Sequence, residues 1–212
     1  MSTLQREIKA IIEELSPEVR ENRQAEYGVN PLFLNRWSPR SYTNQQVSDE
    51  VLYAVLEAAR WAPSSSNGQP WKFIIAKTEE QLNLFQTFIK PNNRLWTDHA
   101  PVLILILSAK YREDGAVNGA SAFDAGAAWA SLALQAKLLG LATRAVGGYD
   151  QEQARIALHI PEAYNLHAVI ALGYQGEKEL LEESFQEKEK PNGRRSLHES
   201  IIEGSFPAQA IN

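Results

Sequence analysis

Two short basic segments near opposite ends of the chain carry the side chains best suited to binding a phosphate group. Arg36 and Arg40 stand four positions apart in RWSPRS, with Ser38 between them, and Arg194 and Arg195 are adjacent in NGRRS. A guanidinium group matches phosphate oxygens with paired hydrogen bonds, and a hydroxyl can add another. Basic pairs on loops are also commonly solvated, and the sequence does not show whether the two segments converge.

A polar loop, WAPSSSNGQPW, is the second candidate site. Its turn-forming and polar residues include Pro63, Ser64, Ser65, Ser66, Asn67 and Pro70. A connection between a helix and a strand needs only a few residues, so this one is long. Hydroxyls, an amide and backbone N–H groups suit the polar edge of a ligand, and no G-x-S-x-G elbow indicates a nucleophilic serine. The alternative is an ordinary loop of turn-forming residues.

Two glycines, Gly147 and Gly148 in VGGYD, are the third candidate. Consecutive glycines after a strand let the backbone approach a ligand closely, although a tight turn is the simpler explanation. The four histidines lack the spacing of a metal-binding helix, and we expect no metal site. No catalytic triad or carboxylate pair is evident. A ligand-binding loop without such a constellation suggests that a cofactor carries the reaction.

Composition limits the class of protein. The 212 residues, with 44% hydrophobic content, can bury one sizeable core, and one domain is the default. A net charge of −5 without a basic face argues against a nucleic-acid partner. The absence of cysteine excludes disulfides and thiolate metal sites. The longest apolar run is too short for a membrane span and the N-terminus does not resemble a signal peptide, so we expect a soluble, cytoplasmic protein.

The periodicity of apolar residues predicts the elements that position these candidates. Helices are expected over 3–15, from 48 to about 60, from 78 to about 89, over 120–140 and from 150 to 160; strands over 71–77, 101–109, 142–148 and 166–174; and irregular or solvated segments over 22–35 and 177–190. Thr78 and Gln81 have the spacing of a capping box. This order indicates an α/β or α+β sandwich with helices on both faces of one sheet, and no glycine-rich dinucleotide motif or P-loop is present.

The predicted helix over residues 120–140 is unusually rich in alanine. Small side chains let another helix approach closely. A buried central helix and a helix at a homodimer interface would both use such a face, and both explanations remain open.

Taken together, these motifs resemble the FMN-dependent nitroreductase family. RWSPRSY is similar to the family's N-terminal phosphate-binding element, and AARWAPSSSNGQPWKFI is similar to its A-P-S-x-x-N-x-Q-P-W motif, which is the most specific match. Further segments resemble the core helix with its flavin-edge turn, the late strand and the C-terminal basic element: DAGAAWASLALQAKLLGLATRAVGGYD, IALGY and NGRRSLHE.

The resemblance implies an α+β fold with a central, mostly antiparallel sheet flanked by helices, in a domain-swapped homodimer. It divides the chain into an N-terminal helical extension (1–30), an FMN-binding domain (31–200) and a C-terminal tail (201–212). The implied cofactor is FMN, with NADH or NADPH as the reductant. Residues implied to contact FMN are Arg36, Trp37, Ser38, Arg40, Asn92, Ala145, Val146, Gly147, Gly148, Arg194 and Arg195, and, from the other subunit, Pro63, Ser64, Ser65, Ser66 and Asn67.

Two positions depart from the family pattern. Trp37 stands where a small or basic residue is common, and Gly147 stands where some members carry glutamate beside the flavin N5. A bare glycine would open space over the ring and alter substrate choice.

The implied activity is hydride transfer from NAD(P)H to FMN, followed by reduction of a small acceptor such as a nitroaromatic or a quinone, in a ping-pong sequence without an obligatory side-chain acid or base. Two alternatives remain. One is a flavin-fold enzyme that does not use nicotinamide, of the dehalogenase, dehydrogenase or flavin-cleaving type. The other is a flavin-binding protein without turnover, because a fold alone does not give a function.

Overall fold

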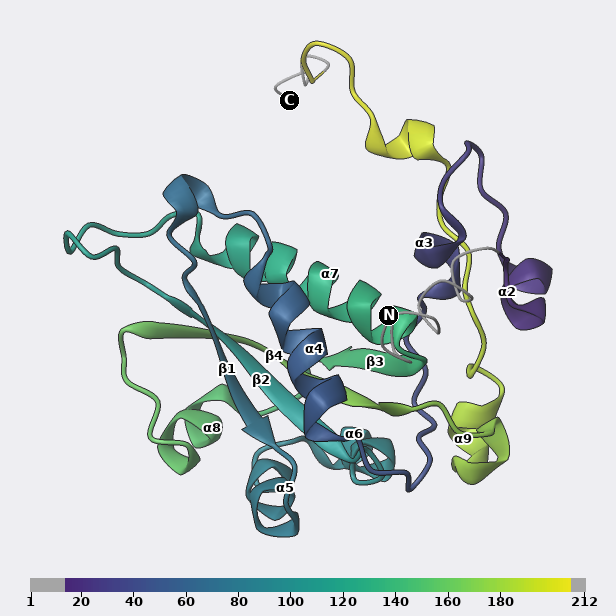
Figure 1. Cartoon of the computed structure of the whole chain (residues 1–212), viewed down its shortest axis with the longest axis horizontal. Coiled ribbons are helices and arrows are strands. Elements are labelled where there is room, and N and C mark those ends of the chain that lie inside the picture. The colour runs from purple at the N-terminus through teal and green to yellow at the C-terminus, as the bar shows by residue number, and fades with distance from the viewer. Residues whose placement is uncertain (1–13, 207–212) are drawn as a thin grey trace, which may run out of the picture.

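One antiparallel sheet forms the centre of the structure, a computed structural model that describes residues 14–206 (Figure 1). The strand order is β1-β2-β4-β3, and every pairing is antiparallel. The strands are β1 (Trp71–Ala76), β2 (Val102–Ala109), β3 (Leu141–Val146) and β4 (Tyr164–Tyr174). The predicted strands are therefore present, and the expected α+β architecture is confirmed.

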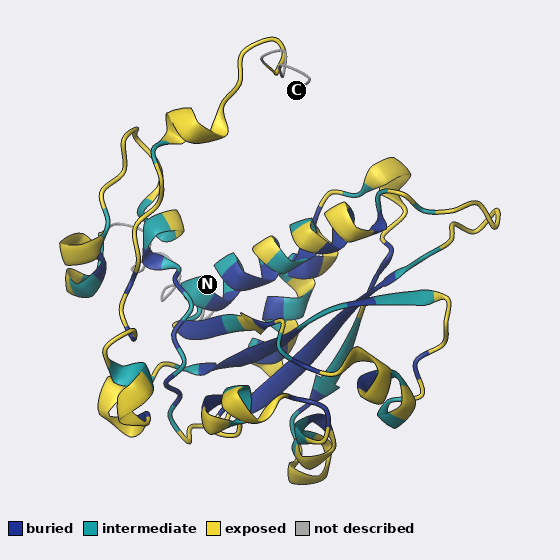
Figure 2. Cartoon of the chain, turned by 180° about the vertical axis from the view of Figure 1, so that it is seen from behind, coloured by how far each residue is buried: buried dark blue, intermediate teal, exposed yellow. Residues whose placement is uncertain are grey.

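The strands of this sheet are largely buried (Figure 2). In β2, Leu103 and Leu105 belong to one hydrophobic cluster, whereas Ile104 and Ile106 belong to another. Because successive side chains of a strand point to opposite faces, an apolar strand of this kind needs cover on both sides. The strand predicted over residues 101–109 therefore lies inside the sheet, between β1 and β4.

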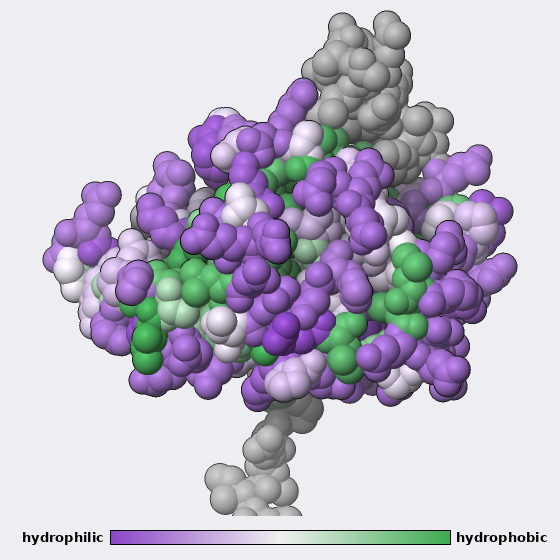
Figure 3. Space-filling view, turned by 90° about the horizontal axis from the view of Figure 1, so that it is seen from below, coloured by the Kyte–Doolittle hydropathy of each residue, from purple (hydrophilic) through white to green (hydrophobic). Residues whose placement is uncertain are grey.

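Helices lie on both faces of the sheet (Figure 1). On one face lie α4 (Asp49–Arg60) and α7 (Ser121–Leu138); on the other lie α5 (Glu79–Gln86), α6 (Pro91–Thr97) and α8 (Gln151–Ala157). Val55 and Leu132 pack on the first face, and Phe85 and Trp96 pack on the second. The surface seen from below in Figure 3 is mostly hydrophilic, with apolar side chains in small groups.

Side-chain caps fix where several of these helices begin. The Ser48 Oγ accepts a hydrogen bond from the Val51 N–H at 3.3 Å, and Thr78 and Gln81 form the predicted capping box of α5. Asp150 caps α8 in the same way. Each cap satisfies a backbone donor that the first turn leaves without an intrahelical partner.

The long helix α7 has one buried and one exposed face. Ala128 and Leu132 are fully buried against the sheet, as expected from the first of the two explanations, a buried central helix. On the opposite side, Gly126 is exposed and Phe123 is 83% exposed. A homodimer interface on that side remains a prediction. Gly140 follows the helix with a φ of 76°, a conformation that glycine adopts without steric cost.

The N-terminal part of the described chain is more helical than expected. The prediction that residues 22–35 are irregular is wrong for α3 (Pro31–Asn35), and α2 (Pro17–Asn22) begins where a helix was expected to end. A proline at the first helical position and the Asn30 side-chain cap favour α3. The helix predicted over residues 3–15 falls almost wholly on residues 1–13, outside those described.

The C-terminal stretch over residues 177–190 is not simply a solvated arm. It contains η2 (Lys178–Leu180) and the short helix α9 (Glu183–Gln186). Leu181 and Glu189 are buried, which contradicts the prediction at these two positions. Leu181 packs into the hydrophobic core, and the Glu189 carboxylate accepts hydrogen bonds from the backbone of another segment.

The two terminal segments lie side by side, away from the sheet (Figure 1). The Arg23 Nε donates to the Asn192 carbonyl at 2.8 Å, and the Leu197 N–H donates to Glu26 at 3.1 Å. Residues 191–206 include η3 (Leu197–Ser200). The division of the chain at residues 30 and 200 stays a prediction.

None of the helices in residues 14–206 combines the length and the apolar composition that crossing a membrane requires.

Candidate functional site

The two basic segments predicted from the sequence meet at one cavity of about 1030 Å³. Arg36 enters it from the loop after α3, and Arg194 enters it from the C-terminal segment. The edge strand β3 and the C-terminal half of α7 supply the remaining wall, with Ala145, Trp129 and Leu134 among the lining residues. The convergence that the sequence left open therefore occurs within a single chain.

The cavity is strongly cationic. Its charged lining residues are Arg23, Arg36, Arg40, Arg144, Lys188, Lys190 and Arg194. Within residues 14–206, no carboxylate belongs to the lining set. Burial, and then the neighbouring Arg194, hold the pKa of Arg36 below its ordinary value. Burial, and then Arg40, do the same to the pKa of Arg144. These cations destabilise one another, and a bound anion would relieve that cost.

The RWSPRS loop (residues 36–41) presents the predicted group of residues to this cavity. Arg36, Trp37, Ser38 and Arg40 all line it. The Arg36 Nη1 donates to the Ser38 Oγ at 3.3 Å, so the guanidinium group and the hydroxyl already lie within reach of one common ligand. Paired N–H donors beside a hydroxyl suit a phosphate monoester.

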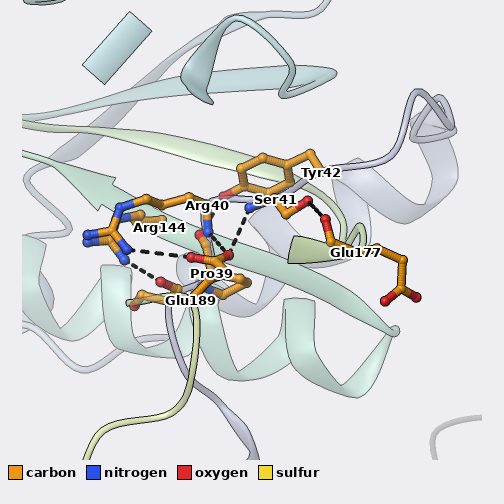
Figure 4. Close-up of polar contacts among 8 residues, drawn as sticks. Pro39, Arg40, Ser41, Tyr42, Arg144, Glu177 and Glu189 are labelled. Carbon is orange, nitrogen blue, oxygen red and sulfur yellow. Dashed lines mark hydrogen bonds and ion pairs between the residues drawn. The ribbon is translucent and has the colours of Figure 1, made fainter. Parts of the chain in front are cut away.

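A buried carboxylate, that of Glu189, holds the backbone of this loop (Figure 4). Glu189 accepts hydrogen bonds from the backbone N–H of Arg40 at 2.5 Å and of Ser41 at 2.9 Å. The Arg40 Nη1 lies 3.5 Å from the same carboxylate, whose side chain is only 3% exposed. The sequence placed Glu189 in a charged stretch, and nothing local distinguishes it from the glutamates around it.

Arg144 also lines the cavity, and the sequence prediction missed it. It stands in the edge strand β3, near Arg40 and Glu189 (Figure 4). It donates to the Ser38 carbonyl, and its guanidinium carbon lies 5.5 Å from the centre of the Trp96 ring. A charged residue within the apolar run ATRAV was the signal that could have found it. For Arg23, Lys188 and Lys190 the sequence offers no comparable signal.

The polar loop WAPSSSNGQPW (residues 61–71), which we call the serine loop, lies away from this cavity. Within it, η1 (Ser65–Asn67) is at the N-terminal end of α7, whereas the cavity is at the C-terminal half (Figure 1). The helix has 18 residues and is about 27 Å long. None of the residues from Pro63 to Asn67 lines the cavity of the same chain. Their predicted contact with a cofactor therefore needs a second chain.

The backbone of this loop is strained. Ser66, Asn67 and Gln69 have φ angles of 51°, 55° and 43°, in the left-handed region that non-glycine residues seldom adopt. The buried Asp124 of α7 accepts a hydrogen bond from the Ser65 N–H at 3.2 Å and holds the loop there. Strain of this kind persists only where the surroundings enforce it, and it is concentrated at functional sites.

The glycine turn after β3 is packed on one side only. The Gly148 carbonyl accepts from the Lys90 N–H at 3.1 Å and from the Asn93 Nδ2 at 3.0 Å. Asn93 makes this contact, whereas the neighbouring Asn92, the predicted residue, is exposed. Gly147 has no heavy atom within 4 Å of the place where a Cβ would stand.

The remaining predicted residues are placed as follows. Ala145 is exposed and lines the cavity, and Val146 is only 2% exposed and packs in the core. Arg195 lines a second cavity, of about 510 Å³, which Arg194 also borders.

The contrast between Gly147 and Gly148 gives a stability prediction. A Cβ at Gly148 would lie 2.2 Å from the Asn93 Nδ2, so Gly148→Ala should displace that amide and lose its hydrogen bond. We expect a loss of about 1–2 kcal/mol in the free energy of unfolding. Gly147→Ala is the matched control and should change it by less than about 0.5 kcal/mol. Urea unfolding of the protein without added ligand measures both, and equal losses in the two variants would exclude this steric explanation.

The histidines show no common ligand site. His167 Nε2 lies 2.7 Å from the Ser108 Oγ of the neighbouring strand, which is a structural contact inside the sheet. In the part of the chain that the structure describes, no three metal-ligating side chains come together.

Fold and site together define an α+β protein with a cationic cavity suited to an anionic cofactor. The sequence model of the Nitroreductase family matches residues 34–174, and the chain belongs to this family. It is an oxidoreductase.

Several relatives are similar over most of the chain. A protein of Archaeoglobus fulgidus, with the provisional name NADH dehydrogenase/NAD(P)H nitroreductase, is 32% identical over 158 residues, which cover 71% of this chain and 88% of that protein. An FMN reductase [NAD(P)H] of Bacillus subtilis is 31% identical over 144 residues, covering 59% and 57% of the two chains. A crystal structure described as an oxidoreductase containing FMN matches with a TM-score of 0.84 and 39% identity, covering 87% of this chain and 96% of that one.

Proposed function

We propose that the chain binds FMN in the cationic cavity and uses it to transfer electrons from NADH or NADPH to a small acceptor such as a nitroaromatic or a quinone. The observation that carries this proposal is the meeting of Arg36 and Arg194 at one cavity. The names of the relatives from Bacillus subtilis and Archaeoglobus fulgidus support the choice of cofactor and reductant.

The chemistry of the cavity fits FMN. Arg36, Arg40 and Arg194 would hold the phosphate, and Ser38 would meet the ribityl chain, because these groups line one wall. Trp37 would contribute its backbone. Hydrogen bonds to a charged group are worth about 1.5–3 kcal/mol each, so a few of them suffice for tight binding. The apolar lining from α7, such as Trp129 and Leu134, would pack against the ring system.

Bound FMN would supply the electron-accepting ring atom, N5, that the side chains lack. The chain's own contribution is to orient the ring and to stabilise charge on it through backbone N–H groups near Ala145, Gly147 and Gly148. Gly147 leaves open space for a substrate above the turn. Donor and acceptor would use this space in turn, which predicts ping-pong kinetics without a side-chain acid or base.

The second part of the proposal is a homodimer with shared flavin sites. The loop residues Ser64, Ser65, Ser66 and Asn67 would reach the cavity of the other subunit, since they lie at the far end of α7 from their own. Phe123, which is 83% exposed beside this loop, and the small exposed residues of α7 suit a subunit interface. A cytoplasmic location, the absence of nucleic-acid, membrane and metal partners, and FMN contacts by Pro63, Asn92, Val146 and Arg195 stay predictions.

Steady-state kinetics test the activity. The FMN-loaded protein is assayed with NADH and with NADPH against a quinone and a nitroaromatic, at several concentrations of each partner. The proposal predicts parallel double-reciprocal lines, whereas intersecting lines would exclude ping-pong transfer. Bound FMN without oxidation of either nicotinamide would favour the flavin-fold enzymes that do not use it. Bound FMN that no donor reduces would favour a non-catalytic flavin protein.

A further inference from the structure

Two oppositely charged side chains hold the two ends of the RWSPRS loop. Both come from outside the segment, residues 34–174, that matches the family. Arg23 precedes it in the chain and Glu189 follows it. Both side chains form hydrogen bonds with backbone groups of the loop or of a residue just before it.

Arg23 holds the start of the loop. Its Nη1 donates to the Leu34 carbonyl at 2.5 Å and to the Arg36 carbonyl at 3.0 Å. Its Nε donates to the Asn192 carbonyl at 2.8 Å, and its Nη2 lies 3.3 Å from the Asn192 Oδ1. One guanidinium group therefore ties together the N-terminal segment, the loop that carries Arg36 and the segment that carries Arg194.

Glu189 holds the end of the loop. Its carboxylate accepts from the N–H groups of Arg40 and Ser41, and its side chain is only 3% exposed. A buried carboxylate is costly unless donors satisfy it, and here two backbone donors and the Arg40 guanidinium do so. It also offsets part of the repulsion between Arg40 and Arg144, since both cations lie beside it (Figure 4).

The hydrogen-bonding groups of both side chains are largely taken up by the protein itself. The Arg23 donors on all three nitrogens already meet protein oxygens. Glu189 carries the same charge as a phosphate. Both therefore act through the residues that they hold: Arg23 fixes the carbonyls of Leu34 and Arg36, and Glu189 fixes the backbone N–H groups of Arg40 and Ser41.

We propose that Arg23 and Glu189 are positioning residues that hold the RWSPRS loop in its ligand-binding conformation, so that the N-terminal extension and the C-terminal segment are parts of the cofactor site. This inference rests on the proposed binding of FMN in this cavity. Pre-ordering of a binding loop increases affinity because the loop loses less freedom when the ligand binds.

The test uses conservative variants of the full chain. Arg23→Lys keeps the charge and loses the planar fork, and Glu189→Gln keeps the shape and loses the charge. Matched controls are Arg20→Lys, on an exposed residue of α2, and Glu187→Gln, on an exposed residue near Glu189. We expect Arg23→Lys and Glu189→Gln each to raise the Kd of FMN by about tenfold or more, which is about 1.4 kcal/mol. The controls should stay within about twofold of the unchanged protein.

The Arg23→Lys result separates positioning from simple attraction. If Arg23 served only as a positive charge, lysine would replace it and the Kd of FMN would not change. That outcome would overturn the inference. The kcat of FMN-saturated protein should remain the same in the two control variants, Arg20→Lys and Glu187→Gln, because neither residue lines the cavity. Arg23 and Glu189 are tested separately. If one variant fails to fold, the FMN affinity of the other still tests the inference.

Amide hydrogen exchange of the protein without FMN gives a second readout. Residues 36–41 should exchange faster in Arg23→Lys and in Glu189→Gln than in the controls. In the first variant the Leu34 and Arg36 carbonyls lose their guanidinium partner, and in the second the Arg40 and Ser41 N–H groups keep only a neutral, weaker acceptor. Unchanged exchange would overturn the inference even if the Kd rises, and faster exchange with an unchanged Kd would also overturn it. If the unchanged protein binds no FMN, the proposed function fails, and exchange alone then decides whether the two residues brace the loop.

Discussion

Replacing Arg36 with glutamine is expected to raise the Kd of FMN by about 100-fold or more, with little change in the kcat of the FMN-saturated protein. Arg36 lies in the wall of the cavity, where its Nη1 is 3.3 Å from the Ser38 Oγ. It would supply paired hydrogen bonds to the phosphate. Losing two charge-assisted bonds costs about 3 kcal/mol, which corresponds to about two decades in Kd. Quenching of flavin fluorescence on titration measures the Kd directly.

Arg94→Gln is the matched control for this variant. Arg94 is a partly exposed arginine of α6 that pairs with Asp98 at the end of the helix, and it does not line the cavity. Its loss should leave the Kd of FMN within about twofold. Arg194→Gln should weaken FMN binding in the same sense as Arg36→Gln. Unchanged FMN affinity in both Arg36→Gln and Arg194→Gln would refute the assignment of the site.

Mixing two variants that each bind FMN weakly, Arg36→Gln and Asn67→Ala, is expected to restore tight FMN binding. Arg36→Gln removes the phosphate contact of a subunit's own cavity, whereas Asn67→Ala removes a contact proposed to reach across to the other subunit. If each site combines one cavity with the other chain's serine loop, a heterodimer of these variants has one intact site and one doubly altered site. Random reassociation of equal amounts should return about one quarter of the sites.

The control is each variant refolded alone, which should gain no sites. Differently charged tags on the two variants allow the heterodimer to be separated. FMN binding that rises in proportion to the fraction of heterodimer would support shared sites. No recovery in a verified heterodimer would mean that cavity and loop act within one chain, contrary to their separation along α7. A monomer that binds FMN tightly would contradict the shared-site proposal as well.

Much of the fold could be predicted because its signals are local. The β2 strand is apolar at every position of one short run, and Thr78 and Gln81 cap α5 from three residues apart. Periodicity and capping act within a few residues, so a single sequence displays them. The prediction failed at Glu189 for the opposite reason. Its burial depends on the backbone of Arg40, 149 positions earlier in the chain.

The residues of the candidate site could likewise be predicted only in part. Arg36 and Arg194 could be named because their segments resemble family motifs, and the structure brings them to one cavity. Arg23 could not be named, because its partner Asn192 is 169 positions away and no local pattern marks the pair. Lys188 and Lys190 look like other lysines in a charged stretch until the fold places them beside the cavity.

A visible absorbance spectrum of the purified protein, taken before and after anaerobic addition of NADPH or NADH, tests the central claim most directly. The protein as purified, or after reconstitution with FMN, should show flavin bands, and these bands should bleach when the nicotinamide is added. A protein that stays colourless after incubation with FMN would contradict the account, because the cationic cavity would then hold some other anion.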